Sequence, residues 1–213
     1  MPVRSLAPVW HQPRMLYLTA CNILFASLWA SVFFKAISHA RDVKTGLFTA
    51  TEPHARWIQT ASLVEILHAA FGLIKSPVRT TALQVVTRVI QVWMVWHSFP
   101  QSTATSHAYL ALLLAWSIAD TIRYTYLALN MHGKAPKSLV WLRYTMFYPL
   151  YPIGIGAEWW LLCRAITPGA KINSVIPPII YFCLILYIPG SYVMYTYMIK
   201  QRKKALRGTR MSL

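Results

Sequence analysis

The sequence contains very little negative charge and few charged residues of either sign. Only 5 of its 213 residues are Asp or Glu, and all charged residues together make up 12% of the chain. An ordinary soluble domain has about 25%. Apolar residues make up 56%. This composition excludes an ordinary soluble domain and predicts a protein embedded in a lipid bilayer.

Cysteine is also scarce. The three cysteines, Cys21, Cys163 and Cys183, all lie within apolar stretches. Their positions have neither the spacing of a metal site nor the pattern of a disulfide framework. We therefore expect no metal site in this chain.

Positive charge, in contrast, is abundant. Lys and Arg number 21, which gives a formal net charge of +16, and such an excess can indicate nucleic-acid binding. Most of these residues, however, flank apolar stretches or lie in the C-terminal segment 200–213. This distribution is typical of a membrane protein that is anchored against anionic lipid headgroups. We therefore expect the lipid bilayer, and not nucleic acid, to be their partner.

Long apolar stretches predict the fold. A membrane-spanning helix needs about 20 apolar residues, and six such stretches follow one another without an internal repeat. The chain is therefore predicted to be all-α, a single integral membrane domain over residues 1–213 that forms a bundle of six transmembrane helices. The predicted spans are residues 15–38, 57–74, 81–99, 107–130, 138–163 and 174–199, followed by a basic cytosolic tail at 200–213.

The distribution of Lys and Arg between the connections predicts the orientation. Twelve of them, including Arg4, fall on the side of the two termini, and six, including Lys44, fall on the other side. Loops rich in Lys and Arg tend to remain in the cytosol. We therefore expect both termini to be cytosolic.

Six charged residues fall inside the predicted spans, where each costs about 2.5–3.5 kcal/mol near a helix centre. Helical spacing puts Glu65 and His68 on one helix face, and Asp120, Arg123 and Tyr124 on another. These groups are either pairs that hold helices together or parts of a functional site. The six charged residues are Glu65, Arg88, Asp120, Arg123, Arg143 and Glu158.

Tyr151 and Glu158 are the residues least compatible with a purely structural role. They are seven residues apart, so they share a helix face with a rise of about 10.5 Å between them in an ideal helix. Pro152, Gly154 and Gly156 lie between them and predict a distortion that brings the two side chains closer. No basic residue lies within one turn of Glu158 on its helix. A buried carboxyl without such a partner indicates function.

At these residues the sequence resembles the very-long-chain (3R)-3-hydroxyacyl-CoA dehydratases, also called protein-tyrosine-phosphatase-like membrane proteins. The resemblance implies a six-helix bundle of the endoplasmic reticulum membrane. It implies the third step of fatty-acid elongation, in which 3-hydroxyacyl-CoA loses water to give trans-2-enoyl-CoA, without a cofactor and with other elongation enzymes as partners. The resembling segments are Val64–Pro77, Gln84–Arg88, Ala115–Tyr124 and Leu142–Glu158.

The resemblance also implies roles for individual residues. The family's essential Tyr and Glu fall on Tyr151 and Glu158, in an intact YPxGxxxE pattern. Asp120 stands where the family usually has Glu, which keeps the charge and suggests a pairing role. Arg143 could instead extend its charge to the membrane surface. The supporting positions of the family fall on Glu65, Gln84, Arg88, Arg143 and Gly154.

The chemistry of dehydration agrees with this pair. The reaction needs a base for the C2 proton and an acid for the departing hydroxyl, and no metal, nucleotide or redox cofactor. A carboxyl in a low-dielectric bundle can remain protonated and donate, whereas a tyrosine acts as a base only beside a cation or suitable hydrogen bonds. We therefore favour Tyr151 as the base and Glu158 as the acid, with Arg88, Arg123 or Arg143 beside the tyrosine. The exchanged roles remain open.

Two other classes of function are less well supported. A proton-coupled transporter usually shows internal repeats and paired helix breaks, and a non-catalytic scaffold would not need both Tyr151 and Glu158. A phosphatase is not supported, because no cysteine precedes a glycine-rich loop that ends in arginine. Four basic residues on the predicted cytosolic loops could bind either the phosphates of CoA or anionic lipid. They are Lys75, Arg79, Lys134 and Lys137.

Overall fold

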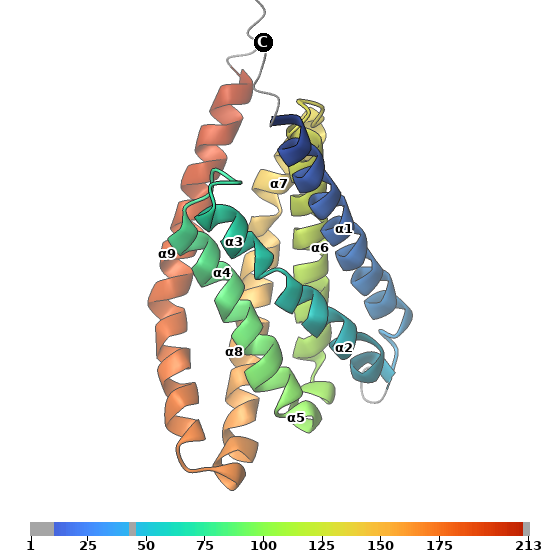
Figure 1. Cartoon of the computed structure of the whole chain (residues 1–213). Coiled ribbons are helices and arrows are strands. Elements are labelled where there is room, and N and C mark those ends of the chain that lie inside the picture. The colour runs from blue at the N-terminus through green and yellow to red at the C-terminus, as the bar shows by residue number, and fades with distance from the viewer. Residues whose placement is uncertain (1–10, 43–45, 211–213) are drawn as a thin grey trace, which may run out of the picture.

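The computed structural model describes residues 11–42 and 46–210, and this part of the chain consists of helices and their connections (Figure 1). The predicted all-α class is confirmed. Arg4 and Lys44, which contribute to the predicted orientation, lie outside the described residues. The helices are α1 (His11–Ser38), α2 (Gly46–Ala61), α3 (Val64–Ala70), α4 (Val78–Ile90), the π-helix η1 (Gln91–His97), α5 (Pro100–Ala104), α6 (His107–Asn130), α7 (Lys137–Thr145), α8 (Phe147–Ile172) and α9 (Ile176–Arg210).

The helix over the second predicted span begins much earlier than expected. The predicted span covers residues 57–74, whereas α2 already begins at Gly46, so the helix extends beyond the predicted span. The polar residues of the expected loop are compatible with a helix, because Glu52 and Arg56 form an ion pair of 2.6 Å one turn apart. A turn at residues 62–63 then separates α2 from α3.

Two further stretches are interrupted at places that apolar composition does not reveal. In residues 81–99 the α-helix widens into a π-helix at Gln91. In residues 138–163 the break falls at Met146, between α7 and α8. The distortion expected after Tyr151 is not a break, because α8 is assigned as one continuous helix across Pro152.

The connection before α6 contains a short helix that was predicted as a loop. α5 occupies much of the polar segment 101–106, and its first residue is proline, which fits the first turn of a helix. Ser106 then caps α6, because its side-chain oxygen accepts a hydrogen bond of 3.3 Å from the backbone N–H of Ala108. α6 has the bounds predicted for the fourth apolar stretch, residues 107–130.

Within residues 11–42 and 46–210, two helices are long and apolar enough to cross a membrane. They comprise Gln12–Ser38 of α1 and Ile176–Leu206 of α9. α9 exposes many large apolar side chains, as is typical of a surface that is covered by lipid or by a partner, and it continues into the predicted tail as far as Arg210. These helices suggest membrane association, whereas the predicted bundle of six transmembrane helices is not confirmed. The exposed side chains on α9 include Tyr181, Phe182, Ile185, Ile188, Tyr192 and Val193.

The packed core lies at one end of the bundle. α6 packs between α1 and α8, and α9 packs on α8 (Figure 1). Near α5, the ring of Trp96 on η1 lies 5.0 Å from that of Tyr109 and 5.3 Å from that of Trp116, measured between centroids. The opposite end, toward Arg210, is where α7 and the end of α9 lie. The fully buried residues of the core include Trp29, Val32, Val92, Trp96, Leu112, Leu113, Leu161 and Ile180.

Candidate active site

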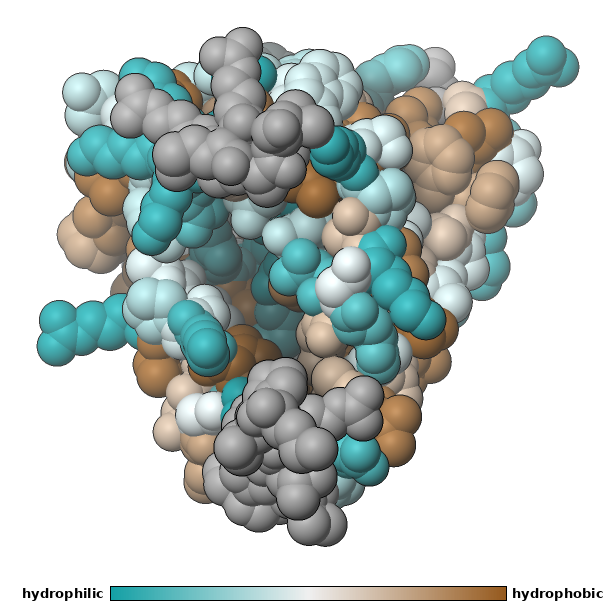
Figure 2. Space-filling view, turned by 90° about the horizontal axis from the view of Figure 1, so that it is seen from above, coloured by the Kyte–Doolittle hydropathy of each residue, from teal (hydrophilic) through white to brown (hydrophobic). Residues whose placement is uncertain are grey.

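A cavity of about 470 Å³ lies between α3, α4, α6, α7, α8 and α9. Figure 2 views the molecule from the end at which α9 finishes, and shows a central hollow whose walls include hydrophilic side chains. The cavity gathers nearly all the polar residues that the sequence singled out, although they are far apart in the chain. These are Glu65, Gln84, Arg88, Asp120, Arg123, Tyr124, Arg143, Tyr151 and Glu158, together with Gly154.

Glu158 is buried and is held at both carboxylate oxygens. Its Oε1 atom accepts a hydrogen bond of 2.9 Å from Trp116 Nε1 on α6, and its Oε2 atom accepts one of 2.9 Å from the Tyr187 hydroxyl on α9. The indole N–H can only donate, so Oε1 is an acceptor in any protonation state. Two helices besides its own therefore position this carboxyl group.

Tyr151 is held more loosely. Its hydroxyl donates to the backbone carbonyl oxygen of Ser191 over 3.4 Å, which is long for a hydrogen bond between oxygens. Its ring stacks on that of Tyr195 at 5.8 Å between centroids. In the described part of the chain, no arginine contact to this hydroxyl is found. The expectation that an arginine lies beside Tyr151 stays a prediction, and one long hydrogen bond holds the hydroxyl in the described residues.

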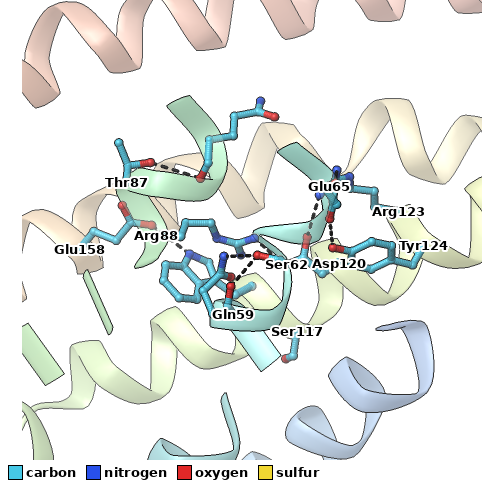
Figure 3. A network of polar contacts seen from close by, with 12 residues as sticks. Gln59, Ser62, Glu65, Thr87, Arg88, Ser117, Asp120, Arg123, Tyr124 and Glu158 are labelled. Carbon is cyan, nitrogen blue, oxygen red and sulfur yellow. Dashed lines mark hydrogen bonds and ion pairs between the residues drawn. The ribbon is translucent and has the colours of Figure 1, made fainter. Parts of the chain in front are cut away.

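Arg88 links the Glu158 carboxyl to the ion pairs of the bundle (Figure 3). Its guanidinium lies 4.1 Å from the centroid of the Trp116 ring, and its Nη1 atom lies 2.6 Å from Asp120 Oδ2. Asp120 in turn is 3.9 Å from Arg123. Trp116, one of the two donors to Glu158, thus packs against a guanidinium that belongs to a network of ion pairs.

Glu65 ends this network on α3. Its carboxylate accepts hydrogen bonds from the Arg123 guanidinium and the Tyr124 hydroxyl (Figure 3). Glu65 and His68 share a face of α3, but they contact different helices. His68 instead lies 2.9 Å from the hydroxyl of Tyr17 on α1 and does not line the cavity.

Arg143 lines the cavity and forms no ion pair with a carboxylate of the described residues. Its guanidinium lies 5.7 Å from the centroid of the Tyr144 ring. Gly154 is buried where α8 passes α6, and an added Cβ atom would lie 3.9 Å from that of Ala115. The four residues of the proposed CoA-binding rim are exposed and do not line this cavity, so their role stays a prediction. They are Lys75, Arg79, Lys134 and Lys137.

Comparison with known proteins identifies the family. Residues 59–208 match the family model described as "Protein tyrosine phosphatase-like protein, PTPLA". The chain belongs to this family. No solved structure matches it. The resemblance noted in the sequence is therefore confirmed at the level of the PTPLA family.

The PTPLA chain is similar over most of its length to several curated proteins. A Schizosaccharomyces pombe protein named "Probable very-long-chain (3R)-3-hydroxyacyl-CoA dehydratase" is 36% identical over 196 residues, which cover 90% of this chain and 93% of that protein. A Caenorhabditis elegans protein named as such a dehydratase, hpo-8, is 36% identical and covers 90% and 95%. Human very-long-chain (3R)-3-hydroxyacyl-CoA dehydratase 2 is 29% identical and covers 91% and 82%.

Two residues that hold Glu158 in this PTPLA chain were not predicted. Trp116 lies one turn before Asp120 on the same face of α6, so spacing could have indicated it, but buried aromatic residues usually serve packing. Tyr187 lies on the last helix among several tyrosines, and no sequence signal distinguishes it. Only the three-dimensional packing of α9 on α8 reveals its contact with Glu158.

Proposed function

We propose that this PTPLA protein is a hydro-lyase that removes water from very-long-chain (3R)-3-hydroxyacyl-CoA to give trans-2-enoyl-CoA, the third step of fatty-acid elongation. The observation that carries the proposal is that Tyr151 and Glu158, the pair of the YPxGxxxE pattern, line one cavity in a chain whose relatives are named as these dehydratases. Neither a transporter nor a non-catalytic scaffold is favoured by these relatives.

The direct test is turnover by the purified protein. The protein in detergent is incubated with a (3R)-3-hydroxyacyl-CoA of very long chain, and formation of the trans-2-enoyl thioester is followed by mass spectrometry. We expect conversion without an added cofactor. No conversion by protein that is shown to be folded would contradict the proposal.

The hydrogen bonds around the pair favour Glu158 as the base and Tyr151 as the acid. Glu158 accepts hydrogen bonds at both oxygens, which suits a carboxylate that receives a proton. Tyr151 donates its proton to a carbonyl oxygen, with no recorded arginine contact in the described residues that would stabilise a phenolate. The roles favoured by the sequence are therefore exchanged in this proposal.

The proposed reaction follows from these roles. Glu158 takes the C2 proton, the electron pair forms the C2–C3 double bond, and the C3–O bond breaks. Tyr151 gives its proton to the departing oxygen, which leaves as water, and proton exchange through solvent restores both residues. Arg143 lines the same cavity and would stabilise the negative charge that develops on the thioester oxygen.

Tyr187 should act as a positioning residue. Tyr187→Phe removes the hydrogen bond to Glu158 Oε2 and keeps the ring, so we expect kcat to fall about 10- to 100-fold, the usual value of a hydrogen bond to a charged group. KM should change little, and the pH profile of kcat should shift. Tyr181→Phe, exposed on the same helix and away from the cavity, is the matched control. Wild-type kcat and pH profile in Tyr187→Phe would exclude this role.

The proposed setting is the endoplasmic reticulum membrane, crossed six times with both termini in the cytosol, and with other elongation enzymes as partners. The basic C-terminal segment and the positive-inside tendency support the orientation. A glycosylation acceptor appended after Leu213 should remain unmodified in microsomes. Efficient modification of that acceptor would mean that the orientation or the number of spans is wrong.

A further inference from the structure

The cavity wall is incomplete between α4 and α9. α4 packs against α2, α3 and η1, whereas α9 packs against α7 and α8. Both helices nevertheless contribute side chains to the same cavity, and neither packs extensively against the other. On this side the cavity wall therefore consists of side chains without a close helix–helix contact behind them.

The side chains at this edge are apolar and reach the outer surface. Leu83 and Ile90 on α4 are 53% and 43% exposed, and Leu186 on α9 is 50% exposed, although all three line the cavity. Gly190 and Met194 continue the wall on α9. We call these five residues the α4–α9 slot. Three of these five residues are thus both exposed and part of the cavity wall, as is expected where a cavity opens to the exterior.

Two polar residues of α4, Gln84 and Thr87, line the cavity beside the slot, and Gln84 is exposed. The Thr87 hydroxyl donates within the helix, over 2.8 Å to the carbonyl oxygen of Leu83 and 3.2 Å to that of Gln84. The charged groups of the cavity pair with one another instead, Arg88 with Asp120 on α6 and Arg123 with Glu65 on α3. An apolar ligand can therefore occupy the slot without leaving buried polar groups unpaired.

The size of the cavity requires such an opening. About 470 Å³ is the volume of a site for a drug-sized ligand. A very-long-chain acyl-CoA, with both a coenzyme and a long hydrocarbon chain, is considerably larger. Since Glu158 and Tyr151 must reach C2 and C3 next to the thioester, the remainder of the chain has to leave the cavity.

We propose that the acyl chain of the substrate leaves the cavity through the α4–α9 slot and lies in the hydrocarbon region of the bilayer. This inference rests on the proposed dehydratase function. Carbons beyond the slot stay in an apolar environment whether or not the substrate is bound, so further lengthening neither gains nor loses hydrophobic energy. The protein therefore accepts long chains without a cavity that matches their length.

The test narrows the slot from either side. An added Cβ atom at Gly190 would meet no atom within 4 Å, so Gly190→Phe places a ring in the slot without a backbone clash. Leu83→Trp narrows it from α4 and carries the test alone if Gly190→Phe does not fold. The readout is the kcat/KM for 3-hydroxyicosanoyl-CoA divided by that for 3-hydroxyhexanoyl-CoA. We expect this ratio to fall by about tenfold or more, because a ring in the slot clashes with a chain that must pass through it, whereas a six-carbon chain is too short to be affected in the same way.

Ile188→Phe is the matched control, because Ile188 is exposed on α9 and does not line the cavity. Its ratio should equal that of the wild type. If the wild type is active and the ratio is unchanged in folded Gly190→Phe and Leu83→Trp, the acyl chain does not leave through the slot. That result would not contradict the dehydratase function. Failure of the wild type to convert either substrate would instead overturn the proposed function.

Discussion

Glu158→Gln and Tyr151→Phe should each lower kcat by about 10²–10⁴, the usual contribution of a general acid or base. Gln keeps the shape of Glu158 and can still accept from Trp116, while its amide N–H can donate to the Tyr187 hydroxyl. Phe keeps the ring that stacks on Tyr195. Neither substitution should therefore unfold the protein. The measurement is the dehydration rate per folded protein.

The double variant sharpens this test. If the two residues perform the two proton transfers of one reaction, the double variant should be little slower than the slower single variant. Trp159→Phe is a suitable control, because Trp159 adjoins Glu158 in the chain but is exposed and lies outside the cavity. Near-normal turnover in either single variant would remove that residue from the mechanism. Near-normal turnover in both would require the dehydratase assignment of this site to be abandoned.

Glu65→Gln should have its main effect on stability. It removes the negative charge that faces Arg123 and weakens the hydrogen bond from Tyr124. Removing one partner of a buried ion pair costs up to about 3–5 kcal/mol, because the remaining charge is poorly compensated. Asp120, at 3.9 Å, offsets part of this loss. We expect a clearly lower Tm, with the dehydration rate per folded protein reduced far less than in Glu158→Gln.

The two readouts separate a structural from a catalytic role for Glu65. Thermal unfolding and turnover are measured on the same preparation, and Glu65→Asp serves as the conservative variant that keeps the charge. Glu65→Asp should recover part of the lost Tm. A Glu65→Gln protein with wild-type Tm but greatly reduced kcat would show instead that Glu65 belongs to the catalytic machinery.

The features of the site that depend on spacing within one helix could be predicted from the sequence. The spacing of Tyr151 and Glu158 put both on one face of a helix, and both line the cavity. The charges inside the predicted spans also meet there, because a buried charge must find a partner in the bundle interior. Apolar composition likewise predicted the bounds of α6, because polar segments flank this apolar stretch at both ends.

Contacts between helices were not predictable in the same way. Glu65 and His68 are three residues apart, yet Glu65 contacts α6 and His68 contacts α1, because each side chain takes the partner that tertiary packing offers. The early start of α2 was not predicted, because charged residues such as Glu52 and Arg56 are typical of a loop in a membrane protein. Their ion pair, which makes them compatible with a helix, becomes visible only in the structure. The acid and base roles depended on what surrounds Tyr151, which only the packing of α9 reveals.

The origin of the Glu158 hydrogen bonds has a consequence for biosynthesis. Trp116 comes from α6, Glu158 from α8, and Tyr187 from α9, the last helix of the described chain. The backbone carbonyl of Ser191 that accepts from Tyr151 also belongs to α9. A nascent chain that lacks α9 therefore holds the Glu158 carboxyl at one oxygen and leaves the Tyr151 hydroxyl without its acceptor. Translation must pass α9 before both side chains are held in position, so α6 and α8 alone do not assemble this site.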